Sequence, residues 1–168
     1  MPLQTDVIDA ISLLTEQHRE VESLFEQIEQ ATDSDDKQTI FLELSDNLAA
    51  HSAIEERVFY PAAYAGDTKD VLLEAVEEHL SVKRLLADLL DMSPEHENFD
   101  AKIKVLKEQI EHHVEEEEKQ LFPKVREQLG SEKLELLGAQ MEDMFEEELD
   151  GDPSESIPQE TAEAARIR

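Results

Sequence analysis

The chain has 168 residues and a formal net charge of −28, from 43 acidic and 15 basic side chains. This charge repels nucleic-acid phosphates and anionic membrane surfaces, so we expect no nucleic acid or membrane as a partner, whereas cations should be attracted. The absence of cysteine excludes disulfides, iron–sulfur clusters and cysteine-ligated zinc, so nitrogen and oxygen must hold any bound metal.

The composition favours helices, because only 5% of the residues are aromatic and only four are glycine. Residues 1–6 (MPLQTD) show no basic segment followed by an apolar run. No apolar stretch approaches the roughly 18 residues that span a bilayer. We therefore expect an all-α protein located in the cytoplasm.

The first three predicted helices each place a histidine on an apolar face. From Val7 onward, apolar residues recur in steps of three and four, typical of an amphipathic helix, and His18 lies within that stripe. In the second helix His51 and Glu55 are in phase with the apolar residues, and the helix ends or kinks near Pro61. His79 takes the same place in the third helix.

The fourth predicted helix begins at Ser93, or one turn later with Asn98 as its N-cap. It places His113 and Glu117 on its inward face. Because one residue turns a helix by about 100°, the neighbouring His112 points to a flank.

Four helices joined by short connections predict an antiparallel up-down-up-down four-helix bundle. After Gly130, residues 131–149 carry enough apolar positions for a short fifth helix against this bundle. Residues 1–149 should therefore form one domain. Residues 150–168 contain two prolines and no sustained periodicity, which predicts a poorly ordered acidic tail.

The second and fourth helices contain one motif twice. Residues 51–61 read HSAIEERVFYP and residues 113–123 read HVEEEEKQLFP, 62 positions later. A second pair, EQHREV at 16–21 and EEHLSV at 77–82, is 61 positions apart. The repeat indicates two similar helical hairpins that face each other.

The repeated histidines and glutamates point to a metal site. A single histidine on an apolar face is more often an ordinary core residue, but here four are in phase, one on each helix. Glu55 and Glu117 strengthen the inference, since a buried carboxylate without a partner costs several kcal/mol. The His-x-x-x-Glu spacing also places both side chains one turn apart on one face, with Cβ atoms about 5–6 Å apart.

The donor types favour iron, manganese or zinc over magnesium or calcium. Six ligands exceed the needs of one tetrahedral zinc ion. Two octahedral ions bridged by both glutamates would use all six and leave roughly two to four positions for water, oxo or a small ligand. A centre of two iron ions is the better fit, with manganese or zinc as alternatives.

With these residues in this order, the chain resembles the hemerythrin-like family of HHE cation-binding domains over about residues 7–125. The resemblance implies a four-helix bundle with a carboxylate-bridged non-haem di-iron centre, oxo- or hydroxo-bridged, that binds oxygen or a related small molecule. It implies Glu55 and Glu117 as the bridges. The full ligand set it implies is His18, His51, Glu55, His79, His113 and Glu117.

Two positions depart from the oxygen-carrying hemerythrins. Where those proteins have a further histidine one turn after the third-helix ligand and an aspartate five residues after the last histidine, this chain has Lys83 and Glu118. We therefore expect one coordination position to be open or filled by water, which argues against simple reversible oxygen carriage. The sequence is more similar to bacterial HHE proteins, some of which respond to oxidative or nitrosative stress and iron load.

Four residues are candidates for contacts with the ligands. Glu56 and Glu118 follow the two bridging glutamates and rotate away from the core, and Lys83 lies one turn after His79. Glu22 lies one turn after His18, where it would supply an extra ligand or, as we favour, an exposed side chain. Tyr60 and Phe122 are expected to be packing residues.

Three functions are compatible with such a centre. The first is binding or sensing of a small diatomic molecule or peroxide, in stress responses or iron handling. The second is an enzyme that processes peroxide or oxygen, and since no acid–base residue is evident the sequence leaves this open. In the third, the metal has a structural role and links the helices of the bundle. The acidic surface then binds a protein partner that the sequence does not identify.

Overall fold

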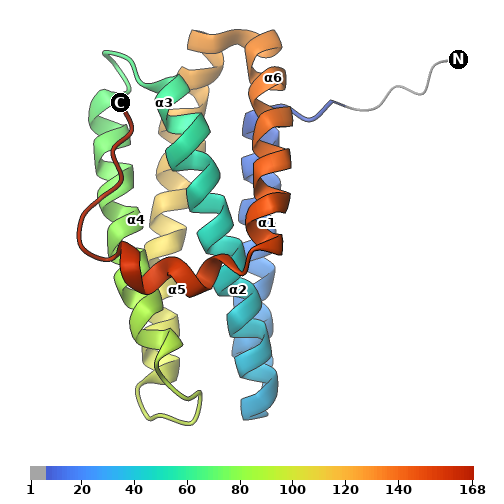
Figure 1. Cartoon of the computed structure of the whole chain (residues 1–168), viewed down its shortest axis with the longest axis vertical. Coiled ribbons are helices and arrows are strands. Elements are labelled where there is room, and N and C mark those ends of the chain that lie inside the picture. The colour runs from blue at the N-terminus through green and yellow to red at the C-terminus, as the bar shows by residue number, and fades with distance from the viewer. Residues whose placement is uncertain (1–6) are drawn as a thin grey trace, which may run out of the picture.

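The computed structural model describes residues 7–168, and residues 1–6, considered above for a targeting signal, lie outside it. All regular structure in the described residues is helical (Figure 1). None of these helices is both long and apolar enough to cross a membrane. The elements are α1 (Ala10–Gln30), α2 (Ser34–Ile54), η1 (Glu55–Phe59), α3 (Tyr60–Ala63), α4 (Lys69–Leu90), α5 (Phe99–Glu116), η2 (Glu117–Leu121), α6 (Phe122–Asp150) and η3 (Pro153–Glu160).

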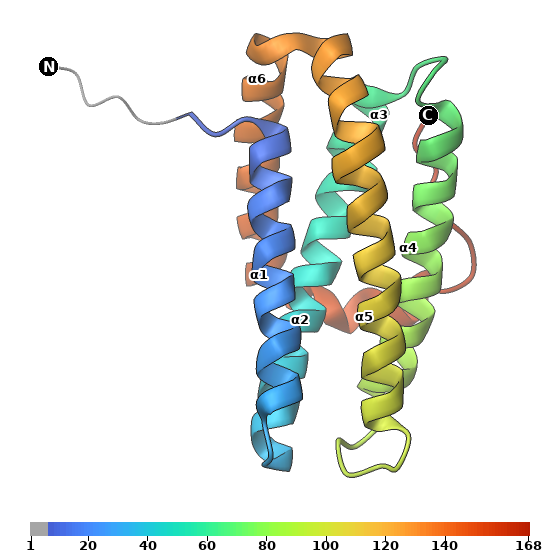
Figure 2. The ribbon, with the colours of Figure 1, turned by 180° about the vertical axis from the view of Figure 1, so that it is seen from behind.

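Four antiparallel rods form the predicted bundle, seen from its two sides in Figures 1 and 2. The first rod is α1, the second runs from α2 through η1 to α3, the third is α4, and the fourth runs from α5 through η2 into the start of α6. Asn98 is the N-cap of α5, so the later of the two predicted starts is right. The all-α four-helix bundle is confirmed.

A kink at Gly130 separates the fourth rod from the fifth helix. Gly130 has φ 77° and ψ 168°, a backbone conformation that favours glycine because it has no Cβ. The remainder of α6 turns back and packs beside α1 and α2 (Figure 1). The predicted fifth helix after Gly130 is therefore present and extends to Asp150.

The C-terminal segment differs from the poorly ordered tail expected over residues 150–168. Its helix η3 crosses the outside of the bundle against α2 and α4 (Figure 1). Ile157 is only 1% exposed, and Ile167 is also buried. Arg84 of α4 donates hydrogen bonds to the carbonyl oxygens of Thr161 and Ala162. A few isolated apolar residues thus anchor the segment without creating a periodic pattern.

The hydrophobic core is divided into two clusters by a layer of polar side chains. Along α1, Leu14 belongs to one cluster and Val21 to the other, with His18 between them. The other three rods show the same order. The buried layer consists of His18, His51, Glu55, His79, His113 and Glu117.

A π-helical turn begins at each buried glutamate. In η1 the N–H of Tyr60 donates to the carbonyl of Glu55, and in η2 the N–H of Phe122 donates to that of Glu117. The next residue in both copies is proline, which has no N–H to continue an α-helical pattern. A π turn contains an extra residue, so the side chains after it are rotated relative to a regular α-helix.

Gly138 offers a test of how the fifth helix packs. A Cβ at Gly138 would lie 2.5 Å from the carbonyl oxygen of Ile8 and 2.8 Å from the amide nitrogen of Ala10. Because backbone atoms cannot move aside as a side chain can, we expect Gly138→Ala to lower the free energy of unfolding by about 1–3 kcal/mol in urea denaturation.

The matched control is Gly66→Ala, since a Cβ at Gly66 would meet nothing within 4 Å. This substitution should leave the unfolding midpoint unchanged or slightly raised. Equal stability of the two variants would contradict the close packing of α6 against the start of α1.

Candidate metal centre

Six side chains from the four rods converge in the polar layer, and their metal-binding atoms form two groups of three. Within each group, one atom from each residue lies within 4.8 Å of the other two. We call them the first trio and the second trio. The first trio is His18, His51 and Glu117, and the second trio is Glu55, His79 and His113.

Each glutamate faces one imidazole of each trio. Glu55 Oε1 lies 2.9 Å from His51 Nε2 and 3.5 Å from His79 Nε2. Glu117 Oε1 lies 3.2 Å from His18 Nε2 and 3.2 Å from His113 Nε2. Each carboxylate therefore lies close to imidazoles of both trios.

Several atoms in this layer are buried without a hydrogen-bond partner. They are both carboxylate oxygens of Glu55, Glu117 Oε1 and His18 Nε2. Imidazole nitrogens lie 2.9 Å from Glu55 Oε1 and 3.2 Å from Glu117 Oε1 but form no hydrogen bond with either oxygen. Buried polar atoms are nearly always paired, since an unpaired one costs about 1–3 kcal/mol and a charged one more. Donor atoms directed at a shared space, and not at one another, fit a metal centre.

In this layer, carboxylates raise the pKa values of neighbouring histidines, and histidines lower the pKa of Glu117. Burial by itself would lower the pKa of His113, but the charge of the adjacent Glu117 and a hydrogen bond to Glu78 raise it well above 6.5. Burial would raise the pKa of Glu117, but His113 and His18 hold it well below 4.5. His18 and His79 also have raised pKa values, because carboxylates outweigh their burial. Glu117 and the imidazoles of His18 and His113 therefore stabilise one another's charged forms.

Glu56 and Glu118 contact ligand imidazoles on the side away from the centre. His79 Nδ1 lies 2.9 Å from Glu56 Oε1, and Lys83 donates to both oxygens of Glu56 at 3.1 Å. His18 Nδ1 lies 3.0 Å from Glu118 Oε2, and Arg19 is ion-paired with Glu118. Lys83 therefore contacts Glu56, which in turn contacts His79.

The sequence analysis missed Gln17 and Glu78. Gln17 Oε1 lies 2.7 Å from His51 Nδ1, and Glu78 Oε1 lies 3.1 Å from His113 Nδ1. Each residue directly precedes a histidine of the layer, so the repeated segments EQHREV and EEHLSV already contained the signal. All four Nδ1 atoms thus face an oxygen that can accept an Nδ1 proton, while the four Nε2 atoms lie toward the centre.

Tyr60 was expected to be a packing residue only, but its hydroxyl lies in the layer. It donates to Glu117 Oε2 at 2.9 Å and lies 3.3 Å from His79 Nε2. Burial, followed by the charges of Glu117 and Glu55, raises the pKa of Tyr60 well above 10. The π turn η1 rotates this residue inward, a change that regular helical phase could not reveal.

Other candidates lie away from the centre. Glu22 is exposed and pairs with Arg19, in agreement with the exposed position favoured above. His112 is 61% exposed and lies on a flank, 3.4 Å from both Glu78 and Glu116.

A small apolar cavity borders the layer. Its volume is about 20 Å³, and its walls combine the four histidines with Ser52 and a set of aliphatic side chains. A space of this size holds about one water molecule. The aliphatic residues that line it are Val21, Leu48, Val82, Ile110 and Val114.

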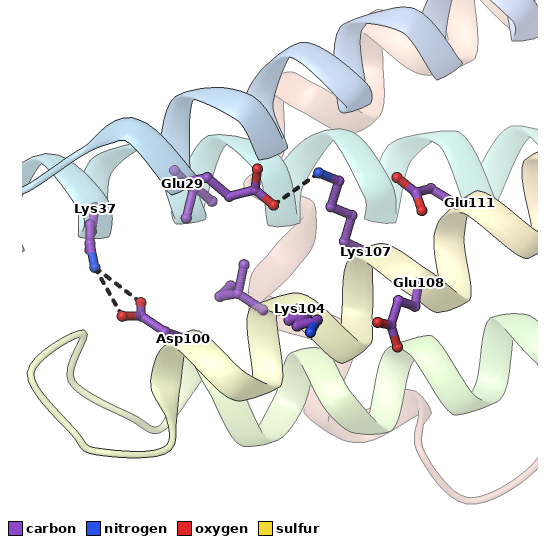
Figure 3. Close-up of a pocket in the computed structure, with 9 residues that line it drawn as sticks. Glu29, Lys37, Asp100, Lys104, Lys107, Glu108 and Glu111 are labelled. Atoms are coloured by element: carbon purple, nitrogen blue, oxygen red, sulfur yellow. Dashed lines mark hydrogen bonds and ion pairs between the residues drawn. The ribbon is translucent and has the colours of Figure 1, made fainter.

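A larger polar cleft of about 460 Å³ lies at the end of the bundle where α1 ends and α5 begins (Figure 3). Lys107 bridges to Glu29 at 2.9 Å, and Lys37 bridges to Asp100 at 3.0 Å. Within residues 7–168, none of the side chains that line this cleft has a buried polar atom left without a partner. The polar layer is therefore the candidate site.

Two relatives are similar to this chain. A protein of Nostoc sp. named DNA nickase is 33% identical over 122 residues, which cover 70% of this chain and 34% of that protein. An uncharacterised hemerythrin-like protein of Schizosaccharomyces pombe is 30% identical over 131 residues, covering 76% of this chain and 63% of the relative. The chain thus spans about a third of the first protein and just under two thirds of the second.

A solved structure is similar over most of its length. The crystal structure of a hemerythrin HHE cation-binding domain-containing protein from Mycobacterium kansasii superposes with a TM-score of 0.75 at 26% identity, covering 86% of this chain and 89% of that one. Residues 9–125 match the family described as the hemerythrin HHE cation binding domain. With two facing trios of histidine and glutamate in a helical bundle, this chain belongs to the hemerythrin HHE cation-binding domain family.

Proposed function

We propose that the polar layer binds two iron ions and that these ions bind oxygen, nitric oxide or peroxide. The proposal is supported by the buried polar atoms that have no hydrogen-bond partner. Glu55 has two such oxygens and, within residues 7–168, no ion pair with lysine or arginine. Cations at the two trios would neutralise both glutamates and use the Nε2 lone pairs. The ligands would be His18, His51, Glu55, His79, His113 and Glu117.

Two ions fit the layer better than one. The donor atoms separate into two trios, and each glutamate stands between them, so each ion would have two imidazoles and a share of both carboxylates. Six nitrogen and oxygen donors suit a pair of octahedral ions such as iron, with manganese as a close alternative. A single tetrahedral zinc ion would leave a carboxylate without a cation.

The cavity beside the layer supports a small ligand. At about 20 Å³ it excludes organic substrates, while its aliphatic walls suit a molecule of two or three atoms. When bound, iron supplies open coordination positions and one-electron redox chemistry toward such molecules. The protein supplies the apolar cavity and the carboxylates that hold the imidazoles in place.

Metal uptake tests this proposal. Metal-free protein titrated with ferrous iron under nitrogen should bind about two ions per chain, and admission of air should produce a near-ultraviolet absorption band. Glu117→Ala should reduce uptake and abolish the band, because it removes one of the two carboxylates that face both trios.

Glu22→Gln is the matched control, since it neutralises an exposed glutamate on α1 and should retain both ions. Uptake of one zinc ion and no iron by the unaltered protein would contradict the proposal. A melting temperature that rises with metal but no response to oxygen, nitric oxide or peroxide would favour the structural alternative.

The pH dependence of stability should differ between metal-free and metal-loaded protein. The raised histidine pKa values stabilise the metal-free fold below about pH 6.5, and this contribution is lost as the pH rises through the higher folded pKa values. The lowered pKa of Glu117 contributes above about pH 4.5 and is lost in more acidic solution.

The melting temperature of metal-free protein should therefore fall from about pH 6.5 upward. That of loaded protein should hold or rise, because metal competes with protons for the same imidazoles. Thermal melts of both forms between about pH 5 and about pH 9 measure the difference. Parallel curves would show that the titrating groups do not bind the metal.

A second candidate, an enzyme that processes peroxide, is favoured by the Tyr60 hydroxyl. Among the hydrogen bonds of residues 7–168, this is the hydroxyl that donates to a glutamate of the layer. It would supply a proton to a ligand in the centre. Oxygen evolution from peroxide by iron-loaded protein, reduced at least tenfold in Tyr60→Phe with two irons still bound, would establish it. Absence of turnover would leave binding as the function.

A further inference from the structure

Each of the four imidazoles contacts a further side chain through its Nδ1 atom, and these contacts follow the sequence repeat. Glu118 holds His18 and Glu56 holds His79, and both glutamates directly follow a bridging glutamate. Gln17 holds His51, as Glu78 holds His113. Both of these residues directly precede a histidine of the partner helix in the hairpin. The contacts are therefore related by the same near-twofold symmetry as the two hairpins.

The chemistry breaks this symmetry at one pair of positions. Glu78 presents a carboxylate to His113, whereas Gln17 presents a neutral amide to His51. Gln17 Nε2 is buried without a partner, so the amide is oriented by its oxygen alone. The first trio is thus backed by one carboxylate and one amide, and the second trio by two carboxylates.

Nearby cations leave this difference uncompensated. Behind the first trio Arg19 pairs with Glu118 and also with the exposed Glu22, and behind the second trio Lys83 pairs with Glu56, so each of these two carboxylates has one basic partner. Glu78 has no lysine or arginine ion pair within residues 7–168, and its second oxygen faces only His112. The side chains that contact the Nδ1 atoms of the second trio therefore carry one more negative charge than those that contact the first trio.

A carboxylate that accepts the Nδ1 proton of an imidazole makes its Nε2 a stronger donor to a cation, and loss of such a partner typically lowers metal affinity by about 10–100-fold. On the basis of the proposed two-ion centre, we propose that Glu78 and Gln17 are positioning residues that make the two metal positions unequal. The position at His79 and His113 fills first and holds its ion more tightly than the position at His18 and His51.

Zinc is a suitable probe of this order, because it is diamagnetic and does not change oxidation state. Histidine ring signals in ¹H–¹⁵N NMR spectra report which imidazoles are bound as zinc is added to metal-free protein. The first equivalent should shift His79 and His113, and the second should shift His18 and His51. Calorimetric titration should resolve two affinities.

Two substitutions and their combination change the asymmetry. Glu78→Gln should weaken the tighter step by about 10–100-fold, and Gln17→Glu should strengthen the weaker step by a similar factor. The double variant carries the same total charge as the original chain and should fill His18 and His51 first. If Glu78 had only a structural role, the double variant would bind zinc more weakly but would still fill the position at His79 and His113 first.

Glu116→Gln is the matched control, since Glu116 lies near His112 but contacts no ligand imidazole, and its order of filling should be unchanged. The inference is overturned if both positions fill together in the original chain, if the double variant keeps the original order, or if Glu116→Gln weakens binding as much as Glu78→Gln. Failure of the original chain to bind two ions would instead overturn the proposed function.

Discussion

The structure depends on the burial of two carboxylates at the centre of a helical bundle. Glu55 is 0% exposed and Glu117 is similarly buried, and the histidines around them are the nearest groups able to carry positive charge. Burying such charges is unfavourable by several kcal/mol per ion unless a cation accompanies them. This layer divides the hydrophobic core into two clusters, so the stability of the bundle and the occupancy of its centre are linked.

Duplication of a hairpin supplies the geometry that this burial requires. Each hairpin contributes two histidines and one glutamate, and each glutamate faces imidazoles of both trios. The π turns that begin at Glu55 and Glu117 place the aromatic residues that follow them against the layer, so that Tyr60 reaches Glu117. Outside the layer, Lys83 and Arg19 fix the carboxylates that orient His79 and His18.

Regular helical phase was enough to predict the bundle, the break at Gly130 and the convergence of the six side chains. It failed where the chain departs from a regular helix, because the π turn brings Tyr60 inward at a position that α-helical spacing assigns to packing. Gln17 was missed because a single glutamine beside a histidine looks like an exposed polar residue. The C-terminal segment was missed because only a few isolated side chains in it are buried, Ile157 and Ile167 among them, and these leave no periodic signal.

The most direct test of the metal centre is anomalous X-ray diffraction from crystals of iron-loaded protein, measured at the iron absorption edge. The account predicts two peaks in the polar layer, one beside His18 and His51 and the other beside His79 and His113, with Glu55 and Glu117 between them. A single peak, or peaks confined to the acidic surface, would contradict it.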